Sequence, residues 1–259
     1  MYILLGHLAL ADAAFACTTA PTMLGTLLYG DQAVPWAGCL AQMYFFIAFA
    51  ITDSFFLAAL TYDHYAAICH PLHYPVLMSP KHCRELAAGA WTLPHPYALT
   101  HTLLMAQLNS CGQPRVPHFS CDTTPLLELA CSDPRTPQAV IFSLGVLVVL
   151  TPITCVVLSY AHILSSVLQV PSAAGKCKAF STCGSHLAVV TLFYGAVLGL
   201  YFRPATSYVA QQDMVANVLY AVVTPIVNPF LYSLRSTDMR KAVQRVFKRS
   251  VTHRGQALP

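Results

Sequence analysis

The sequence predicts an all-α fold, a polytopic bundle of six transmembrane helices followed by a helix in the membrane interface. Two observations lead to this fold class. Hydrophobic residues make up 56% of the 259 residues and charged residues only 9%, whereas soluble globular proteins carry about 25% charged residues. The charged residues also leave long uncharged runs, and about 20 apolar residues suffice for a helix to cross the hydrocarbon layer. This composition excludes a nucleic-acid-binding protein and most soluble enzymes.

Six spans are expected where the uncharged runs lie. The predicted spans cover residues 2–28, 38–65, 82–105, 138–168, 179–203 and 213–233. Proline and glycine inside them are tolerated, because neighbouring helices satisfy the backbone groups that these residues leave free. We interpret the whole chain, 1–259, as a single transmembrane domain.

Basic residues predict which ends of the spans face the cytoplasm, because short cytoplasmic loops are enriched in Lys and Arg. With the C-terminus inside, eleven basic residues face the cytoplasm and three, Arg115, Arg135 and Arg203, face outside. The opposite orientation would reverse this distribution. We therefore expect a multi-pass membrane protein with a cytoplasmic C-terminus.

The segment after the last span, 235–249, carries apolar residues at helical spacing between basic ones. The apolar positions are Met239, Val243, Val246 and Phe247. Such a segment is expected to lie as a helix against the anionic inner leaflet. A solvated basic tail is the alternative.

Four cysteines lie on the predicted outer side. Cys39 begins the second span, and Cys111, Cys121 and Cys131 are evenly spaced in the outer loop. An oxidising compartment favours disulfide bonds, so we expect two bonds, for which three connectivities are open. Four buried free thiols are the alternative.

Two acidic residues, Asp12 and Asp53, fall inside predicted spans. Carboxylates at membrane depth are costly, so they are candidates for a functional role by default.

The histidines and cysteines do not form a catalytic or metal-binding motif. The sequence contains no His-Glu-x-x-His, Cys-x-x-Cys or Gly-x-Ser-x-Gly pattern. We interpret His162 and His186, on apolar spans, as hydrogen-bonded structural residues. We therefore expect no enzyme, metal or cofactor. A secondary transporter would favour paired halves with matching broken helices, and no such repeat is apparent.

Several short motifs follow one another in a characteristic order. Residues 8–12 read LALAD, 61–74 read TYDHYAAICHPLHY, 159–160 read SY, 178–187 read KAFSTCGSHL and 225–235 read PIVNPFLYSLR. Together with the outer loop of three cysteines, they make the chain closely resemble vertebrate olfactory (odorant) receptors of the rhodopsin-like G protein-coupled class. The resemblance covers nearly the whole chain.

The resemblance implies an odorant pocket in the outer half of a seven-helix bundle. Odorant binding shifts an equilibrium between inactive and active states, which opens an inner cleft for an olfactory, stimulatory heterotrimeric G protein. The implied partners are a small-molecule odorant, that G protein and membrane lipid, with no nucleic acid. Because no acid lies on the outer stretch of the second span, we expect a neutral, volatile, largely apolar ligand held by a tyrosine hydroxyl.

Residue by residue, the resemblance implies four groups. The ligand-binding group is Phe46, Ile47, Ala50, Ile51, Tyr194, Val197, Leu198 and Tyr201. The coupling and activation group is Asp63, His64, Tyr65, Tyr160, Lys178, Asn228, Pro229 and Tyr232. The disulfides would join Cys39 with Cys121 and Cys111 with Cys131, and Asp12 and Asp53 would line a sodium-type site. Ordinary helix packing is the alternative for the pocket residues, and protonated acids joining helices are the alternative for the sodium site.

The chain departs from the family at two places. The family reads Asp-Arg-Tyr where this chain has Asp63, His64 and Tyr65. Histidine is mostly neutral near pH 7 and does not replace a permanent, forked cation, so we expect weaker or more pH-sensitive coupling.

The second departure is at the start of the chain. Met1 and Tyr2 match the point just after the family's first helix and inner loop, so we expect six of the seven helices. Either translation starts upstream of Met1, or the product is truncated. A truncated, non-signalling remnant retained inside the cell is therefore one rival hypothesis, and a small transporter is a weaker one.

Overall fold

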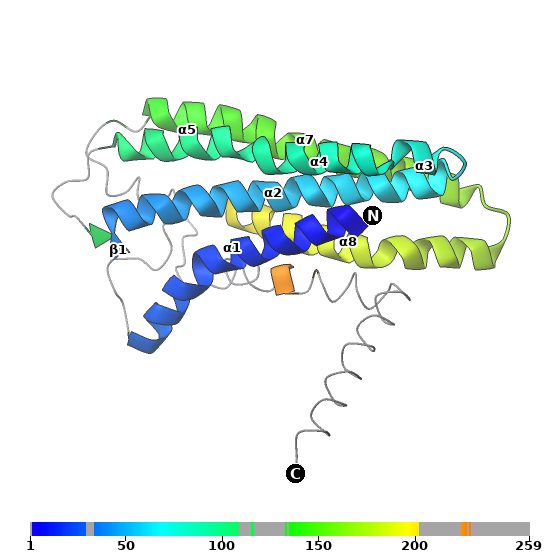
Figure 1. Cartoon of the computed structure of the whole chain (residues 1–259), viewed down its shortest axis with the longest axis horizontal. Coiled ribbons are helices and arrows are strands. Elements are labelled where there is room, and N and C mark those ends of the chain that lie inside the picture. The colour runs from blue at the N-terminus through cyan, green and yellow to red at the C-terminus, as the bar shows by residue number, and fades with distance from the viewer. Residues whose placement is uncertain are drawn as a thin grey trace, which may run out of the picture.

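The computed structural model of the chain describes residues 2–29, 34–108, 115–116, 133, 135–201, 224–226 and 228. Within its helices, it does not describe the side chains of residues 26–27, 178–182, 185 and 198–201. The long helices in this part are α1 (Tyr2–Tyr29), α2 (Trp36–Cys69), α7 (Arg135–Leu168) and α8 (Ala173–Tyr201). The shorter ones are α3 (Tyr74–Leu77), α4 (Pro80–Thr92) and α5 (Pro94–Ala106). The helices run side by side in one bundle (Figure 1), which confirms the predicted all-α class.

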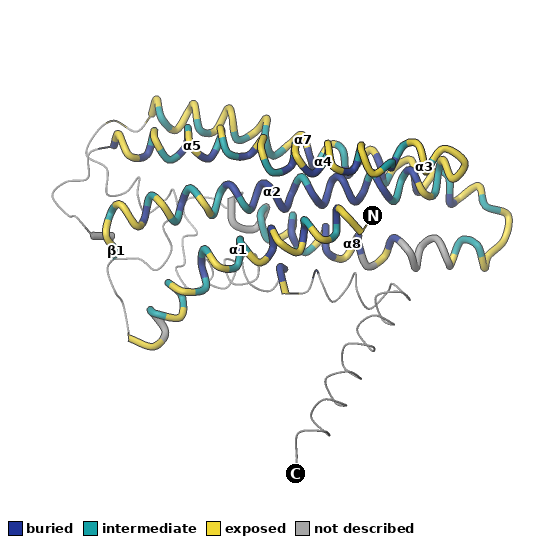
Figure 2. Tube along the Cα trace, viewed as in Figure 1, coloured by how far each residue is buried: buried dark blue, intermediate teal, exposed yellow. Residues whose placement is uncertain are grey.

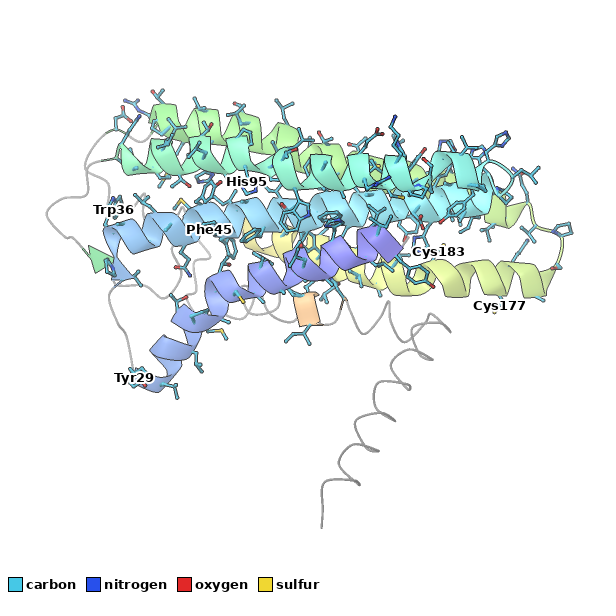
Figure 3. All side chains as sticks on the ribbon, viewed as in Figure 1. Tyr29, Trp36, Phe45, His95, Cys177 and Cys183 are labelled. Atoms are coloured by element: carbon cyan, nitrogen blue, oxygen red, sulfur yellow. The ribbon has the colours of Figure 1, made fainter. Side chains whose placement is uncertain are left out.

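A two-residue ladder joins two loops at one end of the bundle. Strand β1 (Val34–Pro35) pairs antiparallel with β2 (Arg115–Val116), and Val34 lies opposite Val116. Trp36 and Tyr29 lie at this end, and Cys177 lies at the opposite end (Figure 3). We call these the Trp36 end and the Cys177 end.

Helix α2 is the centre of the bundle and contacts every other described helix. Phe56, Leu57 and Leu60 are fully buried at its middle, and Figure 2 shows burial along most of its length. Helix α7 instead exposes many large apolar side chains, including Phe142 and Leu147. Such an exposed apolar face suits contact with lipid, because lipid tails are as apolar as these side chains.

Three of the described helices are long and apolar enough to cross a membrane. They are Tyr2–Gly25, Trp36–Cys69 and Arg135–Leu168. The helices of the second, fourth and fifth predicted spans begin before the predicted starts, and α2 also ends later, at Cys69. A run without charged residues indicates the part of a helix that lies in the hydrocarbon layer. Because a helix can continue into the polar interface, the positions of charged residues alone do not locate its ends.

The predicted span 82–105 is divided into α4 and α5 at Leu93. Proline has no backbone N–H, so Pro94 and Pro96 cannot donate to the preceding turn, and the hydrogen-bond ladder is interrupted there. Leu93 keeps helical dihedral angles, φ −63° and ψ −33°, and the two helices continue in nearly one direction (Figure 1). Together they cover the predicted span.

Candidate ligand-binding and coupling sites

A buried polar site lies between α1 and α2. Asp12, Asp53 and Asn228 are only 3%, 1% and 1% exposed. Asn228 Nδ2 donates a hydrogen bond of 2.8 Å to Asp12 Oδ1, and Asp12 and Asp53 lie close enough to interact electrostatically. The structure therefore brings together both acids of the predicted sodium-type site and one residue of the predicted activation group.

Three oxygen atoms of this site have no hydrogen-bond partner among the described residues: Asp12 Oδ2, Asp53 Oδ1 and Asn228 Oδ1. Buried polar atoms usually have partners, so these oxygens leave room for a proton or a cation. Hard cations prefer such carboxylate and amide oxygens.

The predicted ligand-binding residues divide between two faces of α2. Ala50 belongs to one apolar cluster between α1, α2, α4 and α8, and Phe46, Tyr194 and Val197 pack against that cluster. Ile47 instead packs against a separate cluster of Cys39, Met43, Met105 and Leu108. Ile51 is buried, and the side chains of Leu198 and Tyr201 lie outside the described part. The structure thus gathers four of these residues and separates Ile47 from them.

One polar contact lies beside this apolar cluster. The hydroxyl groups of Tyr194 and Ser54 are 2.7 Å apart and join α8 to α2. Sequence reasoning selected Tyr194 but missed Ser54. The signal was available, because Ser54 follows Ala50 by one helical turn and therefore lies on the same face. Either hydroxyl can be the donor of this bond, and because a hydroxyl group both donates and accepts, the pair keeps capacity to bond a polar group of a ligand.

Toward the Cys177 end, three side chains connect three helices. Tyr160 of α7 hydrogen-bonds His186 of α8 through the hydroxyl oxygen and Nδ1, 2.7 Å apart. The ring of His186 stacks on His64 of α2, with ring centroids 4.9 Å apart and planes inclined by 29°. The prediction that His186 is hydrogen-bonded is confirmed by this contact.

His64, at the position of the family's arginine, bonds to its own helix. His64 Nδ1 lies 2.7 Å from the backbone oxygen of Leu60, and because a carbonyl only accepts, this nitrogen is the donor. An imidazole held in this way cannot reach out as an arginine side chain does.

The neighbouring acid has a partner in the following short helix. Tyr74 of α3 donates a hydrogen bond of 2.9 Å to Asp63 Oδ1. Burial and the negative charge of Asp63 raise the pKa of Tyr74 well above its ordinary value, so the hydroxyl keeps its proton at physiological pH. Sequence reasoning missed Tyr74, although it lies within the same motif. Tyr65, the third residue of the triplet, contacts His70 Nε2 at 2.9 Å.

Several predicted residues fall outside the described part of the chain. Cys39 is disulfide-bonded, but its partner is not among the described residues, and neither are Cys111, Cys121, Cys131, Pro229 and Tyr232. Lys178 lies in α8, but its side chain is not described. The predicted interfacial helix 235–249 and most of the predicted span 213–233 also lie outside the described residues.

Among the described residues, no group of three or more His, Cys, Asp or Glu side chains lies close enough to hold a metal ion.

Comparison with known proteins identifies the family. Residues 1–250 match the model of the olfactory receptor family. The chain is 48% identical to olfactory receptor 1f45 of Rattus norvegicus over 246 residues, which are 95% of this chain and 79% of the relative. It is 48% identical to the human olfactory receptor 1F1 over 251 residues, 97% of this chain and 80% of the relative. It is also 48% identical to the human olfactory receptor 1A1 over 252 residues, which are 97% of this chain and 81% of the relative.

A family match over nearly the whole chain and relatives at this level of identity agree with the helical bundle and its motifs. The chain therefore belongs to the olfactory receptor family, whose members are multi-pass G protein-coupled membrane receptors and not enzymes.

Proposed function

We propose that the chain binds a small, neutral, volatile odorant near the Tyr194 and Ser54 pair and signals through a stimulatory heterotrimeric G protein at the Cys177 end. In this proposal the Cys177 end and the C-terminus face the cytoplasm, and the receptor works at the plasma membrane. The excess of basic residues on that side supports this orientation.

The observation that carries the proposal is the 2.7 Å contact between Tyr194 and Ser54. Tyr194 also packs, together with Phe46 and Val197, against the apolar cluster that contains Ala50. Small-ligand sites generally combine an apolar lining with a few polar groups that orient the ligand. A molecule with one carbonyl or hydroxyl group could exchange for one partner of this pair and place its hydrocarbon part in the cluster.

Helix α8 provides a route from this site to the Cys177 end. Tyr194 contacts Ser54 of α2, and His186, eight residues earlier on α8, stacks on His64 of α2. Eight residues span about 12 Å of helix. A ligand that separates Tyr194 from Ser54 therefore acts on the helix that also carries the His186 contacts. It shifts the equilibrium only if it binds the state with separated helices more tightly.

We also propose that Asp12, Asp53 and Asn228 hold a sodium ion, which their unpartnered oxygens support. For the outer loop we propose bonds of Cys39 with Cys121 and of Cys111 with Cys131. Lys178, Pro229 and Tyr232 are proposed to act in coupling with Asp63, His64, Tyr65 and Tyr160, and Ile47, Ile51, Leu198 and Tyr201 to complete the ligand-binding region.

Surface staining combined with a cyclic AMP assay tests the proposal. Cells that express the tagged chain are exposed to a panel of neutral odorants, with and without the olfactory stimulatory G protein α subunit. We expect surface staining and an odorant-dependent rise in cyclic AMP that requires this subunit. Staining confined to internal membranes, or an odorant response that does not need the subunit, would overturn the proposal.

A further inference from the structure

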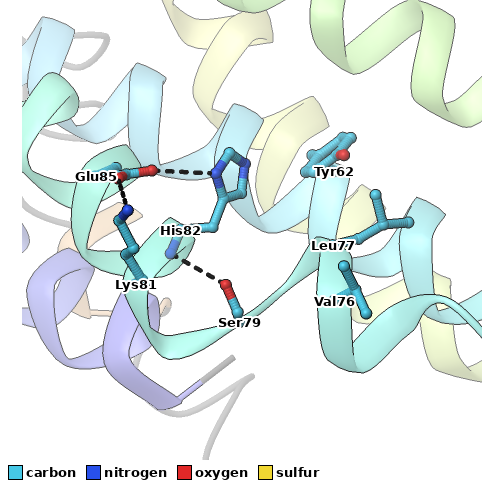
Figure 4. Close-up of a pocket in the computed structure, with 7 residues that line it drawn as sticks. All are labelled: Tyr62, Val76, Leu77, Ser79, Lys81, His82 and Glu85. Atoms are coloured by element: carbon cyan, nitrogen blue, oxygen red, sulfur yellow. Dashed lines mark hydrogen bonds and ion pairs between the residues drawn. The ribbon is translucent and has the colours of Figure 1, made fainter.

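A shallow hollow of about 340 Å³ opens at the Cys177 end, where α2, α3 and the first turns of α4 meet. Its lining combines apolar and polar groups (Figure 4). Tyr62, Val76 and Leu77 form one side, and Lys81, His82 and Glu85 form the other. Neither the odorant site nor the His186 contacts use these side chains.

The length of α2 places this hollow at the depth of lipid headgroups. Its 34 residues span about 50 Å at 1.5 Å per residue, whereas the hydrocarbon core is about 30 Å thick. If the helix protrudes equally on both sides, roughly 10 Å at each end lies in the polar layer. Tyr62 lies at this boundary, where tyrosine is enriched in membrane proteins.

The positive charge of Lys81 is not committed to a strong partner. Its Nζ lies 4.0 Å from Glu85 Oε1, and the Lys81 side chain is 84% exposed. Exposed ion pairs of this kind contribute little. Glu85 also lies 3.5 Å from His82 Nδ1. Lys81 and His82 can therefore turn toward an anion at little cost.

The other side of the hollow is suited to hydrocarbon. Val76 is 76% exposed, although it lies next to Leu77 and the ring of Tyr62 in the same lining. Basic groups beside an exposed apolar surface are typical of segments that bind the membrane interface.

We propose that this hollow binds the phosphate-bearing headgroup of an anionic phospholipid from the adjacent leaflet. Lys81 and His82 contact the phosphate, while Val76 and Leu77 contact the glycerol and the first acyl carbons. A lipid fits better than an acidic peptide, because headgroups are concentrated at this depth. The proposal rests on the membrane placement of the chain and on the orientation proposed above, in which the Cys177 end faces the anionic cytoplasmic leaflet, and it does not depend on the odorant response.

Lipid binding to the purified full chain in detergent tests the proposal. The probes are dioctanoyl phosphatidylinositol 4,5-bisphosphate and, as a neutral reference, dioctanoyl phosphatidylcholine. We expect the anionic probe alone to bind with measurable affinity. Lys81→Gln should weaken this binding about fivefold, since one basic residue near an anionic surface contributes about that factor. Glu85→Gln should strengthen it, because the competing carboxylate is lost.

Lys176→Gln is the matched control. Lys176 lies in α8, one helical turn from its start near the Cys177 end, but does not line the hollow, so its replacement should leave the affinity unchanged. Equal losses in Lys81→Gln and Lys176→Gln would overturn the proposal in favour of non-specific attraction. Unchanged or weaker binding by Glu85→Gln would also overturn it. A gain in affinity cannot result from misfolding, so this variant keeps the test decisive.

Discussion

Asn228 Nδ2 donates a hydrogen bond of 2.8 Å to Asp12 Oδ1, although 216 positions separate the two residues in the sequence. The contact brings Asn228 to α1 and assembles the buried polar site with Asp53. Since Asp12 Oδ2, Asp53 Oδ1 and Asn228 Oδ1 have no hydrogen-bond partner among the described residues, the site is suited to a sodium ion that would influence the equilibrium between receptor states.

Asp12→Asn should abolish any sodium dependence of the odorant response. The change removes one negative charge and keeps the shape of the side chain. When sodium is replaced by N-methyl-D-glucamine in the cyclic AMP assay, we expect the wild-type EC50 to change by about fivefold or more, as is typical of coupling between two sites. The EC50 of Asp12→Asn should not change.

Asp133→Asn provides the control for the sodium test. Asp133 is an exposed acid outside the buried site, bonded to Arg135, so this variant should keep the sodium dependence of the wild type. A wild-type response that ignores sodium would contradict the prediction and would indicate that the two buried acids share protons instead.

Tyr194→Phe should weaken the response to odorants that carry a carbonyl or hydroxyl group. Loss of one hydrogen bond costs about 1 kcal/mol, which corresponds to roughly a fivefold rise in EC50. Hydrocarbon odorants should be unaffected, because they cannot accept the bond. Dose–response curves for pairs of odorants that differ in one oxygen atom measure the effect.

Tyr44→Phe is the matched control for Tyr194→Phe. Tyr44 also loses one hydrogen bond, to His95 Nδ1 at 2.9 Å, but it does not belong to the cluster around Ala50. If the EC50 for odorants with a carbonyl or hydroxyl group rises equally in both variants, Tyr194 does not contact the odorant.

The sequence predicted the features that depend on composition and local pattern. The fold class, the burial of Asp12 and Asp53, and the position of the DHY triplet near the end of α2 follow from where charges and motifs lie along the chain. The contacts between helices could not be predicted from the sequence in this way. Ser54 meets Tyr194 across 140 positions, and Ile47 faces the cluster of Met43 and Met105, because the rotation of each helix about its axis is set by packing. Helical spacing alone cannot distinguish two apolar faces of a helix that is buried on nearly all sides.

Cys39→Ser and Cys121→Ser should reduce surface expression to the same extent, and the double variant should lose no more than either one. This result follows if the two cysteines form one disulfide, whose loss typically costs 2–5 kcal/mol. Cys39→Ser combined with Cys111→Ser should be worse than either single variant, because two bonds are then broken. Quantitative surface staining under non-reducing conditions distinguishes the connectivities, and equal effects of the two pairs would contradict the proposed one.

Tyr74→Phe should raise basal cyclic AMP. The change removes the 2.9 Å hydrogen bond to Asp63, which ties α3 to the end of α2. A loss of about 1 kcal/mol would change the ratio of active to inactive receptor by roughly fivefold. Because burial and the charge of Asp63 raise the pKa of Tyr74, the bond is already complete below pH 8, so the increase should be the same at pH 6 and pH 8.

Tyr65→Phe provides the comparison, since it removes a hydrogen bond of the same length to His70 and leaves the Asp63 contact intact. Basal activity that rises equally in both variants would show that any loosened contact in this region activates the receptor.

His64→Arg should increase the maximal odorant response. In the wild type, His64 donates to the Leu60 carbonyl and stacks on His186, which Tyr160 bonds from α7. None of these groups is a permanent, forked cation, whereas an arginine supplies one.

The maximal odorant-dependent rise in cyclic AMP, compared at equal surface expression, tests the prediction for His64. His82→Arg serves as the control, because His82 lies in α4 and lines the separate hollow beside Lys81, so it should leave the maximal response unchanged. If His64→Arg gives the same maximal response as the wild type, the histidine does not limit coupling. The stacked pair of His64 and His186 would then serve only to hold α2 and α8 together.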